Sequence, residues 1–390
     1  MRLIAVKDIR PDMVLGKSIF TQNNMLLLGA GYRIPSEFKT KLIDRGLNHV
    51  YIMEKGTEEI IPEDIISDEL RMQVHSQLAQ KTEEIGKYFS FKDLNRRKIY
   101  DLVKSGYLKD FNITYDMKII VSNILGEMAQ ARILKTMLFK TKNTYYMDHA
   151  LNTTILSILI GKKYRFNNNE LLTLAVGSFL HDFGKIVLEK LNESSKGTMA
   201  DELMREHPIF GYLLVHRSSG ASPMVCQIIN QHHEQQDGKG YPIGLKGENL
   251  PPVTNTSFQR NTRGMIFRLA EICSVANTYD NLVMNPNSEK QLTPTEAVGE
   301  IIMKSGTVLN KHIVGTLTKI VPAFPVGTVV RINDIFDPTL IGYRGVVAKV
   351  NEEHIDRPVV ILIYDRSMRK IKPRIIDTSK ISKVDLELVL

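Results

Sequence analysis

The stretch LLTLAVGSFLHDFGK, residues Leu171–Lys185, decides the fold of this chain. Its first ten residues are mostly apolar, and their spacing predicts a buried helix over Glu170–Leu180. The helix is followed at once by His181 and Asp182, an adjacent imidazole and carboxylate. Both groups lose water at a buried helix end, so they need a partner that satisfies both of them. A metal ion is such a partner.

Further histidines lie at the ends of other predicted helices on either side of this stretch. His149 begins one helix, and His207 precedes Pro208, where another would begin. His232 and His233 end a helix that starts near Met224. A glycine-rich turn, DGKGYP, then occupies residues 237–242. The sequence therefore predicts that several helix ends meet around one metal site.

The donor set indicates which ions and which chemistry such a site would suit. Imidazoles with one carboxylate favour Fe, Mn, Zn or Co, whereas calcium and magnesium prefer oxygen ligands. The ligands outnumber those of one four-coordinate ion, so two ions sharing Asp182 fit the count better. Two metals about 3.5–4 Å apart assist phosphoryl transfer. Lys185, one helical turn beyond His181, would direct a cation at a phosphate oxygen. Asp182 and Lys185 are the expected catalytic residues.

Together these motifs resemble the HD-GYP subgroup of HD-domain phosphohydrolases, the cyclic di-GMP phosphodiesterases. The residues that carry the resemblance are His149, HDFGK at 181–185, His207-Pro208 and HHEQQDGKGYP at 232–242. The resemblance covers residues 140–330 and extends more loosely to both flanks. It implies hydrolysis of cyclic di-GMP to the linear dinucleotide, and often on to GMP, with two divalent ions in the site, iron or manganese.

The resemblance also implies a role for each matching residue. His149, His181 and Asp182 would hold the first metal, with Asn277 at the position of a further ligand. Asp182, His207, His232 and His233 would hold the second. Lys185 would contact the substrate phosphate. The turn Gly240-Tyr241-Pro242 would lie beside the site and bind substrate or a signalling protein partner.

The chain departs from the family pattern at three positions. Asn277 stands where the family has a metal-binding aspartate, in the element ANTYD at 276–280. Asp280 could replace that ligand, although a capping or ion-pairing role is the favoured interpretation. Asn285-Pro286-Asn287 replaces an R-P-Y element, so an arginine for substrate phosphate is missing. Tyr145 replaces a glutamate that supports a third metal in some members.

Two nearby features could restore the missing cation. An insertion, Leu250–Gly264, carries Arg260 and Arg263 and is either a surface loop, the favoured reading, or a lid over the site. Lys290 could act in the same way, but a solvated lysine is the safer interpretation.

The sequence predicts a multidomain α+β protein, with an all-α HD-type core between a small α/β module and a β-rich module. Helical spacing recurs in 119–138, 150–163, 170–180 and 224–232, and strand-like segments begin at Phe324. The expected domains are 1–55 for the N-terminal module, 56–110 for a linker and helices, 111–320 for the metal-dependent domain and 321–390 for the β-rich module. Exposed helices between residues 70 and 130 offer a surface for a homodimer.

Composition limits the cellular setting and the partners. The net charge of +8 suits an anionic substrate, but no motif for nucleic acid appears. We expect no membrane span and no signal peptide. The two cysteines, Cys226 and Cys273, lie in apolar helical patterns and indicate core residues in a reducing compartment. A cytoplasmic location is expected.

Two alternatives to the cyclic di-GMP phosphodiesterase remain open. Because of Asn277, the chain could be a catalytically weak member that senses a cyclic dinucleotide or binds a partner protein through the GYP turn. It could also hydrolyse another nucleotide, including a mixed cyclic dinucleotide, since no residue selects guanine over adenine.

Overall fold

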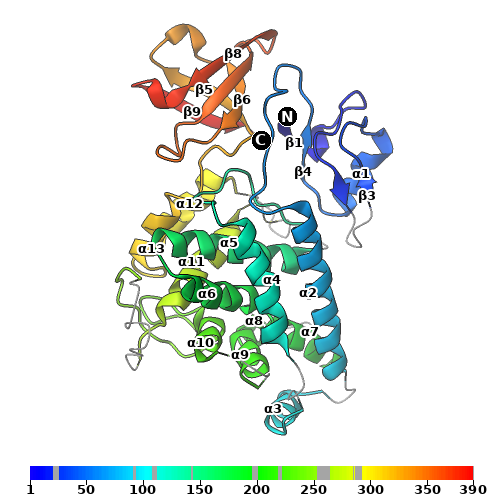
Figure 1. Ribbon diagram of the computed structural model, residues 1–390, viewed down its shortest axis with the longest axis vertical. Helices are drawn as coiled ribbons and strands as arrows, with labels where there is room; N and C mark the ends of the chain where they lie inside the picture. Colours follow the sequence, from blue (N-terminus) through cyan, green and yellow to red (C-terminus); the bar gives the residue numbers. More distant parts are fainter. Residues whose placement is uncertain are drawn as a thin grey trace.

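The computed structural model contains three regions, a small α/β module, a helical body and an antiparallel sheet, so the predicted fold class is confirmed (Figure 1). The described residues are 1–20, 26–90, 94–107, 112–141, 144–195, 201–217, 222–252, 264–283, 285 and 292–389, without the side chains of 192–195 and 201–202.

The N-terminal module consists of two antiparallel strand pairs and one helix. Strand β1 (Arg2–Ala5) pairs with β4 (His49–Ile52), and β2 (Ile19–Phe20) pairs with β3 (Leu26–Leu28). Helix α1 (Ser36–Asp44) packs its buried Leu42 into the small apolar core of this module.

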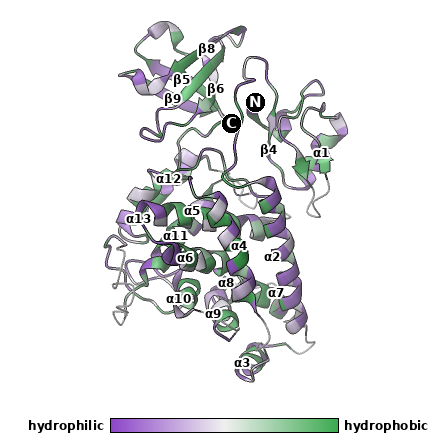
Figure 2. Ribbon diagram, viewed as in Figure 1, coloured by the Kyte–Doolittle hydropathy of each residue, from purple (hydrophilic) through white to green (hydrophobic). Residues whose placement is uncertain are grey.

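Helices α2 to α13 build the body. Their bounds are α2 (Asp68–Tyr88), α3 (Arg96–Lys104), α4 (Ile113–Glu127), α5 (Tyr145–Lys163), α6 (Asn168–Leu180), α7 (Gly184–Ser195), α8 (Asp201–Met204), α9 (His207–Arg217), α10 (Pro223–Gln231), α11 (Arg268–Leu282), α12 (Pro294–Met303) and α13 (Lys311–Leu317). Helix α5 packs against α6 and α11 and is buried along residues 148–161, whereas α2 lies along one side of the body with many hydrophilic residues (Figure 2). Asn167 and Glu170 form a capping box that fixes the start of α6.

The segment Asn168–Leu191 is long and apolar enough to span a membrane by composition, but it belongs to the protein core. It comprises α6, the His181–Phe183 turn and the start of α7, and 78% of its apolar window is buried inside the protein. Its hydrophobicity is therefore explained by packing against α5 and α10. Cys226 and Cys273 are both buried and unpaired, as expected of core residues.

One predicted helix is wrong in its second half. The apolar spacing of residues 119–138 indicates a continuous helix, but α4 ends at Glu127. The chain then continues as turns and bends without regular secondary structure between the body and the sheet. There Leu134 N donates to Ile320 O (3.0 Å) and Val326 N to Lys135 O (2.8 Å). Ile133 and Leu134 are apolar because they are buried on both sides of this passage, not because they line a helix.

The C-terminal region is a five-stranded antiparallel sheet in the order β8-β7-β6-β5-β9. Its strands are β5 (Val329–Ile335), β6 (Arg344–Lys349), β7 (Val359–Tyr364), β8 (Lys370–Asp377) and β9 (Val384–Val389). The sheet also contacts the N-terminal module, since Leu3 N donates to Gly327 O (2.7 Å) and Glu54 pairs with both Arg2 and Lys370. The predicted linker after residue 54 is accordingly partly packed, with Ile60 buried against Val326 and Val346.

Candidate metal centre

The five predicted histidines and Asp182 meet where four helix ends converge. His149 lies near the start of α5, one turn in, and His181 and Asp182 directly follow α6. His207 is the first residue of α9, and His232 and His233 directly follow α10. Gly184 allows this approach, because a Cβ there would lie 1.9 Å from the His207 carbonyl oxygen. The glycine of the HDFGK stretch is therefore needed to bring α9 against Asp182.

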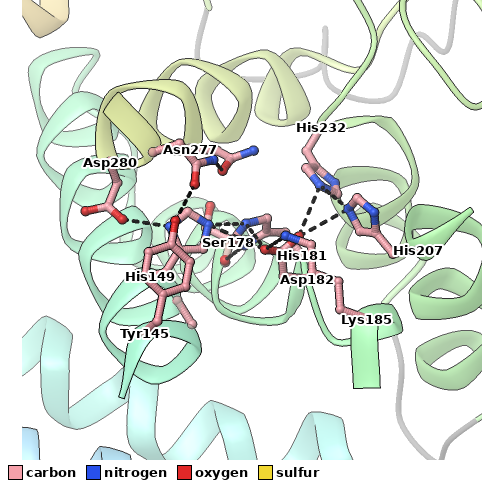
Figure 3. Close-up of polar contacts among 12 residues, drawn as sticks. Tyr145, His149, Ser178, His181, Asp182, Lys185, His207, His232, Asn277 and Asp280 are labelled. Atoms are coloured by element: carbon pink, nitrogen blue, oxygen red, sulfur yellow. Dashed lines mark hydrogen bonds and ion pairs between the residues drawn. The ribbon is translucent and has the colours of Figure 1, made fainter. Parts of the chain in front are cut away.

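Asp182 joins two groups of donor atoms (Figure 3). Its Oδ2 lies 3.5 Å from His149 Nε2 and 3.6 Å from His181 Nε2. Its Oδ1 lies 3.1 Å from His207 Nε2 and 3.8 Å from His232 Nε2. Within each group, the second of which also contains His233, the donor atoms all lie within 4.8 Å of one another. One carboxylate thus presents one oxygen to each group.

Hydrogen bonds fix the tautomers of four of the histidines. Nδ1 donates to a main-chain carbonyl in three of them: His181 to Ser178 O (2.6 Å), His207 to Met204 O (2.7 Å) and His232 to Ile229 O (2.7 Å). In the fourth, Nδ1 of His149 donates to Asp280 Oδ2 (2.7 Å). A carbonyl or carboxylate oxygen can only accept, so the proton is on Nδ1, and Nε2 of a neutral ring carries a lone pair.

These lone pairs face one another without a proton between them. His149 Nε2 lies 3.2 Å from His181 Nε2, and His207 Nε2 lies 3.2 Å from His232 Nε2. Asp182 Oδ1 is buried and has no hydrogen-bond donor among the described residues. In a dry interior, the two nitrogens of each pair repel each other through their lone pairs, and the carboxylate oxygen is left without a partner. The donor set and its burial fit divalent cations at both positions.

Burial also controls the charge of the site. It lowers the pKa of His181 to about 4 and lowers the pKa values of His232 and His233 well below the ordinary value. For Asp182, burial alone would raise the pKa, but Lys185 and the imidazole of His181 outweigh it and hold the pKa well below its ordinary value. Neutral imidazoles around an ionised carboxylate are the protonation states that a cation needs.

We expect the metal-free protein to lose stability as the pH falls from about 6.5 to about 4. In this range the histidines of the unfolded chain take up protons that buried His181 and His232 and partly buried His233 cannot, so the unfolded state is favoured. Each such histidine lowers the free energy of unfolding by about 1.4 kcal/mol per pH unit. Urea denaturation in chelator at several pH values measures the slope.

The exposed His354 provides the control for this pH dependence. The variant His354→Gln should show the same slope as the wild type. A free energy of unfolding that stays constant between pH 7 and pH 5 would contradict the buried, neutral state of these rings.

Asp280 acts on His149 from outside the donor groups. Its carboxylate is fully buried, and besides the bond from His149 Nδ1 its Oδ1 accepts from Asn152 Nδ2 (3.0 Å). Lys140 Nζ lies 3.1 Å from Asp280 Oδ2 and also donates to the carbonyl oxygens of Asp280 and Val283. Of the two roles considered for Asp280, ion pairing is the one that the structure shows.

Asn277 lies one turn before Asp280 on α11 and is buried. Its Oδ1 accepts a hydrogen bond from Asn281 Nδ2 (2.6 Å), and Asn281 Oδ1 accepts from the Tyr145 hydroxyl (2.9 Å). The Tyr145 ring stacks on His149, with centroids 5.8 Å apart and planes 3° apart. Tyr145 therefore packs against a candidate ligand instead of supplying one. Asn277 offers one remaining lone pair, without charge, on the His149 side of the site.

Lys185 contacts the shared carboxylate, and the GYP turn lies beside the second donor group. Lys185 Nζ pairs with Asp182 Oδ2 and is partly exposed. The Tyr241 ring stacks on His233, with centroids 4.6 Å apart. Glu234 shapes the turn by accepting the main-chain N–H groups of Ile243 (2.8 Å) and Leu245 (2.7 Å).

The remaining residues that the sequence analysis considered add no donor atom to the site among the described residues. Asn285 Nδ2 donates to Asn281 O (2.9 Å), so this residue extends the end of α11. Arg260, Arg263, Pro286, Asn287 and Lys290 lie outside the described residues. Sequence reasoning did not identify Lys140 or Arg205, and it named Glu234 in the HHE motif without giving it a role. The guanidinium of Arg205 lies 4.7 Å from the centre of the Tyr241 ring, and its sequence signal is only a basic residue two positions before His207.

Comparisons with known proteins match the part of the chain that holds these residues to a family model. Residues 146–282 match the model of the HD domain. The chain is 24% identical over 198 residues to the cyclic di-GMP phosphodiesterase PdeB of Borreliella burgdorferi, covering 50% of this chain and 48% of the relative. It is 23% identical over 257 residues to the cyclic di-GMP phosphodiesterase PA4108 of Pseudomonas aeruginosa, covering 65% of this chain and 56% of the relative.

The chain spans about half the length of these curated relatives. Among solved structures it is similar to Bd1817, a HDG"Y"P protein from Bdellovibrio bacteriovorus, with a TM-score of 0.39 and 19% identity over 82% of this chain and 98% of that chain. A TM-score this low adds no argument of its own. The HD-domain match spans the five histidines and Asp182 that the structure brings together.

Proposed function

Since residues 146–282 of this chain form an HD domain, we propose that the protein is a metal-dependent phosphodiesterase that hydrolyses cyclic di-GMP to the linear dinucleotide or GMP. The observation that carries the proposal is the pair of donor groups that share Asp182. The names of the relatives PdeB and PA4108 support the substrate.

Each residue has a role in this proposal. His149, His181 and Asp182 hold one divalent ion, with Asn277 as a weak further ligand. Asp182, His207, His232 and His233 hold the second. Iron or manganese bound there would supply Lewis-acid activation of water and of the phosphoryl oxygens. Asp280 keeps the His149 proton on Nδ1, so that Nε2 stays free for coordination.

Three further features orient the substrate. Lys185, next to Asp182 Oδ2, places a positive charge where a phosphate oxygen gains negative charge. A pocket lined by Tyr146, Met147 and Phe179 reaches both Asp182 and Lys185. It offers apolar surface for a nucleotide base beside the reacting phosphate. The turn Gly240-Tyr241-Pro242 closes the other side as a contact for substrate or a signalling partner.

The second candidate function is a cyclic dinucleotide sensor, and Asn277 is the observation that favours it. A neutral amide, already engaged by Asn281, attracts an ion less than a carboxylate does. If the first ion is lost, the chain would bind the dinucleotide without cleaving it.

Turnover and binding measurements separate the two functions. The purified protein, loaded anaerobically with Fe(II) or Mn(II), should convert cyclic di-GMP to linear product detected by chromatography. Calorimetric binding of cyclic di-GMP without turnover by either metal form would reject the enzyme and support the sensor. A mixed cyclic dinucleotide tested in parallel shows whether the base matters.

The variant Asn277→Asp should bind the first ion more tightly. A carboxylate and a cation 4 Å apart attract by about 4 kcal/mol per pair of unit charges at an effective dielectric of 20, so a gain of tenfold or more in affinity is a conservative expectation. Metal titration with Mn(II) measures it. The variant Asn285→Asp, whose residue lies beyond the end of α11, is the control for an added charge. Equal affinities in Asn277→Asp and wild type would show that position 277 does not face an ion.

The setting of the enzyme is also a proposal. Buried, unpaired Cys226 and Cys273 and the buried apolar segment 168–191 support a cytoplasmic location.

We assign residues 1–55 to an accessory module, 56–110 to connecting helices, 111–320 to the phosphodiesterase and 321–390 to the β-rich module. Exposed Tyr115 and Ile119 on α4 support a homodimer surface between residues 70 and 130.

A further inference from the structure

We infer that Arg205 binds the phosphodiester of the dinucleotide that is not being cleaved, an inference that rests on the proposed function. A cyclic dinucleotide contains two phosphodiesters. One would lie at the donor groups with Lys185, so the second needs a cation farther out. Arg205 lies next to the site and is exposed.

The position of Arg205 is defined by Tyr241. The guanidinium lies 4.7 Å from the centre of the Tyr241 ring, in a cation–π contact. His233 stacks on the same ring at 4.6 Å, with planes 16° apart. Arg205 and the candidate ligand His233 thus contact the same ring. The guanidinium therefore lies beside the donor groups, on the residue that lines their edge, and within reach of the same substrate.

The main chain around Arg205 is held on both sides. His207 Nδ1 donates to Met204 O (2.7 Å), and Glu206 N donates to Leu203 O (3.0 Å). The Glu206 carboxylate pairs with Arg96 of α3 at 2.8 Å. The loop that presents Arg205 is thus tied to the candidate ligand His207, so its main chain keeps a defined place beside the donor groups.

The guanidinium is available for an anion. In the described part of the chain no carboxylate lies within ion-pair distance of Arg205. Lys185, by contrast, pairs with Asp182. Stacking on Tyr241 leaves the edge of the guanidinium plane open, and this edge carries the N–H groups that bind two phosphate oxygens at once. Arg205 would thus supply the cation that is missing at Asn285.

Two substrates test this inference. Cyclic di-GMP contains a second phosphodiester, whereas bis(p-nitrophenyl) phosphate contains only one. The variant Arg205→Gln should lower kcat/KM for cyclic di-GMP by about 10- to 100-fold, mainly through KM, as expected for a lost charge-assisted pair. It should leave kcat/KM for bis(p-nitrophenyl) phosphate and the metal content within about twofold of wild type. Arg205→Lys keeps the charge but not the planar fork, so its kcat/KM for cyclic di-GMP should lie between those of the wild type and Arg205→Gln.

Arg217→Gln is the matched control. Arg217 is an exposed arginine at the last position of α9, about 15 Å along the helix from His207. It should behave as wild type with both substrates. Equal losses for both substrates in Arg205→Gln would show that Arg205 only supports the Tyr241 turn, and no loss for either would show that it has no role. Both outcomes overturn the inference.

Failure of the proposed function is distinguishable from failure of this inference. If the wild type cleaves neither substrate, the hydrolysis is rejected, and the inference is then tested by calorimetric binding of cyclic di-GMP. Arg205→Gln should weaken that binding by the same 10- to 100-fold, while an unchanged Kd would overturn the role of Arg205.

Discussion

Replacing Asp182 with alanine is expected to remove most of the bound metal and most of the activity. The wild type should hold close to two ions per chain, and Asp182→Ala should hold fewer than one, because one carboxylate serves both donor groups. Residues that only orient a ligand typically cost 10- to 100-fold when changed, so the loss of a shared ligand should cost at least about 100-fold in kcat/KM. Elemental analysis and turnover of cyclic di-GMP measure the two effects.

Asp334→Ala provides the matched control for this change. Asp334 is a partly exposed carboxylate on β5 that pairs with Lys383, far along the chain from the donor groups. Its loss should leave metal content and activity unchanged. Two ions per chain in Asp182→Ala would reject the shared-ligand arrangement, and a metal-free wild type would reject the metal centre.

The variant Lys140→Met is expected to destabilise the protein by about 3–5 kcal/mol, the usual cost of leaving one partner of a buried ion pair without the other. The side chains of Lys140 and Asp280 are both fully buried, and methionine cannot replace the bonds from Nζ to the carboxylate and the two carbonyl oxygens. Urea denaturation followed by circular dichroism measures the loss. Activity should also fall, because Asp280 holds the His149 ring.

A double variant separates the charge effect from lost packing. In Lys140→Met with Asp280→Asn no uncompensated charge remains, so part of the stability should return. Lys17→Met is the control for a lysine in a partly exposed pair, with Asp64, and should cost no more than about 1 kcal/mol. If Lys140→Met costs no more than Lys17→Met, the buried pair does not stabilise the fold as described.

Much of the fold could be predicted because local pattern and burial agree in most of the chain. The apolar spacing of Leu171–Leu180 and the Asn167–Glu170 box specify α6 by themselves. The exception is the passage of turns and bends after Glu127. There the apolar spacing is typical of a helix, but the residues are apolar because they contact Ile320 and the sheet. These contacts depend on distant parts of the chain and cannot be predicted from the local sequence.

The donor residues of the site could also be predicted as a set, because each stands at a helix end that the sequence marks. The match of residues 146–282 to the HD domain confirms the family resemblance. The metal roles of His149, His181, Asp182, His207, His232, His233 and Asn277 stay proposals, as do the roles of Lys185 and the GYP turn. The tautomers could not be predicted, since they depend on carbonyl groups such as Met204 O and Ile229 O.

The sequence by itself determined the helical core, the kinds of donor atom and their places at helix ends, because these follow from residue spacing and from the chemistry of imidazole and carboxylate. The tertiary structure alone decided which other groups surround the donor residues and the GYP turn. Lys140 reaches Asp280 across 140 positions of chain, and Arg205 meets the ring of Tyr241 on another loop. Such contacts arise from the packing of separate helices, and residue spacing along one segment carries no record of them.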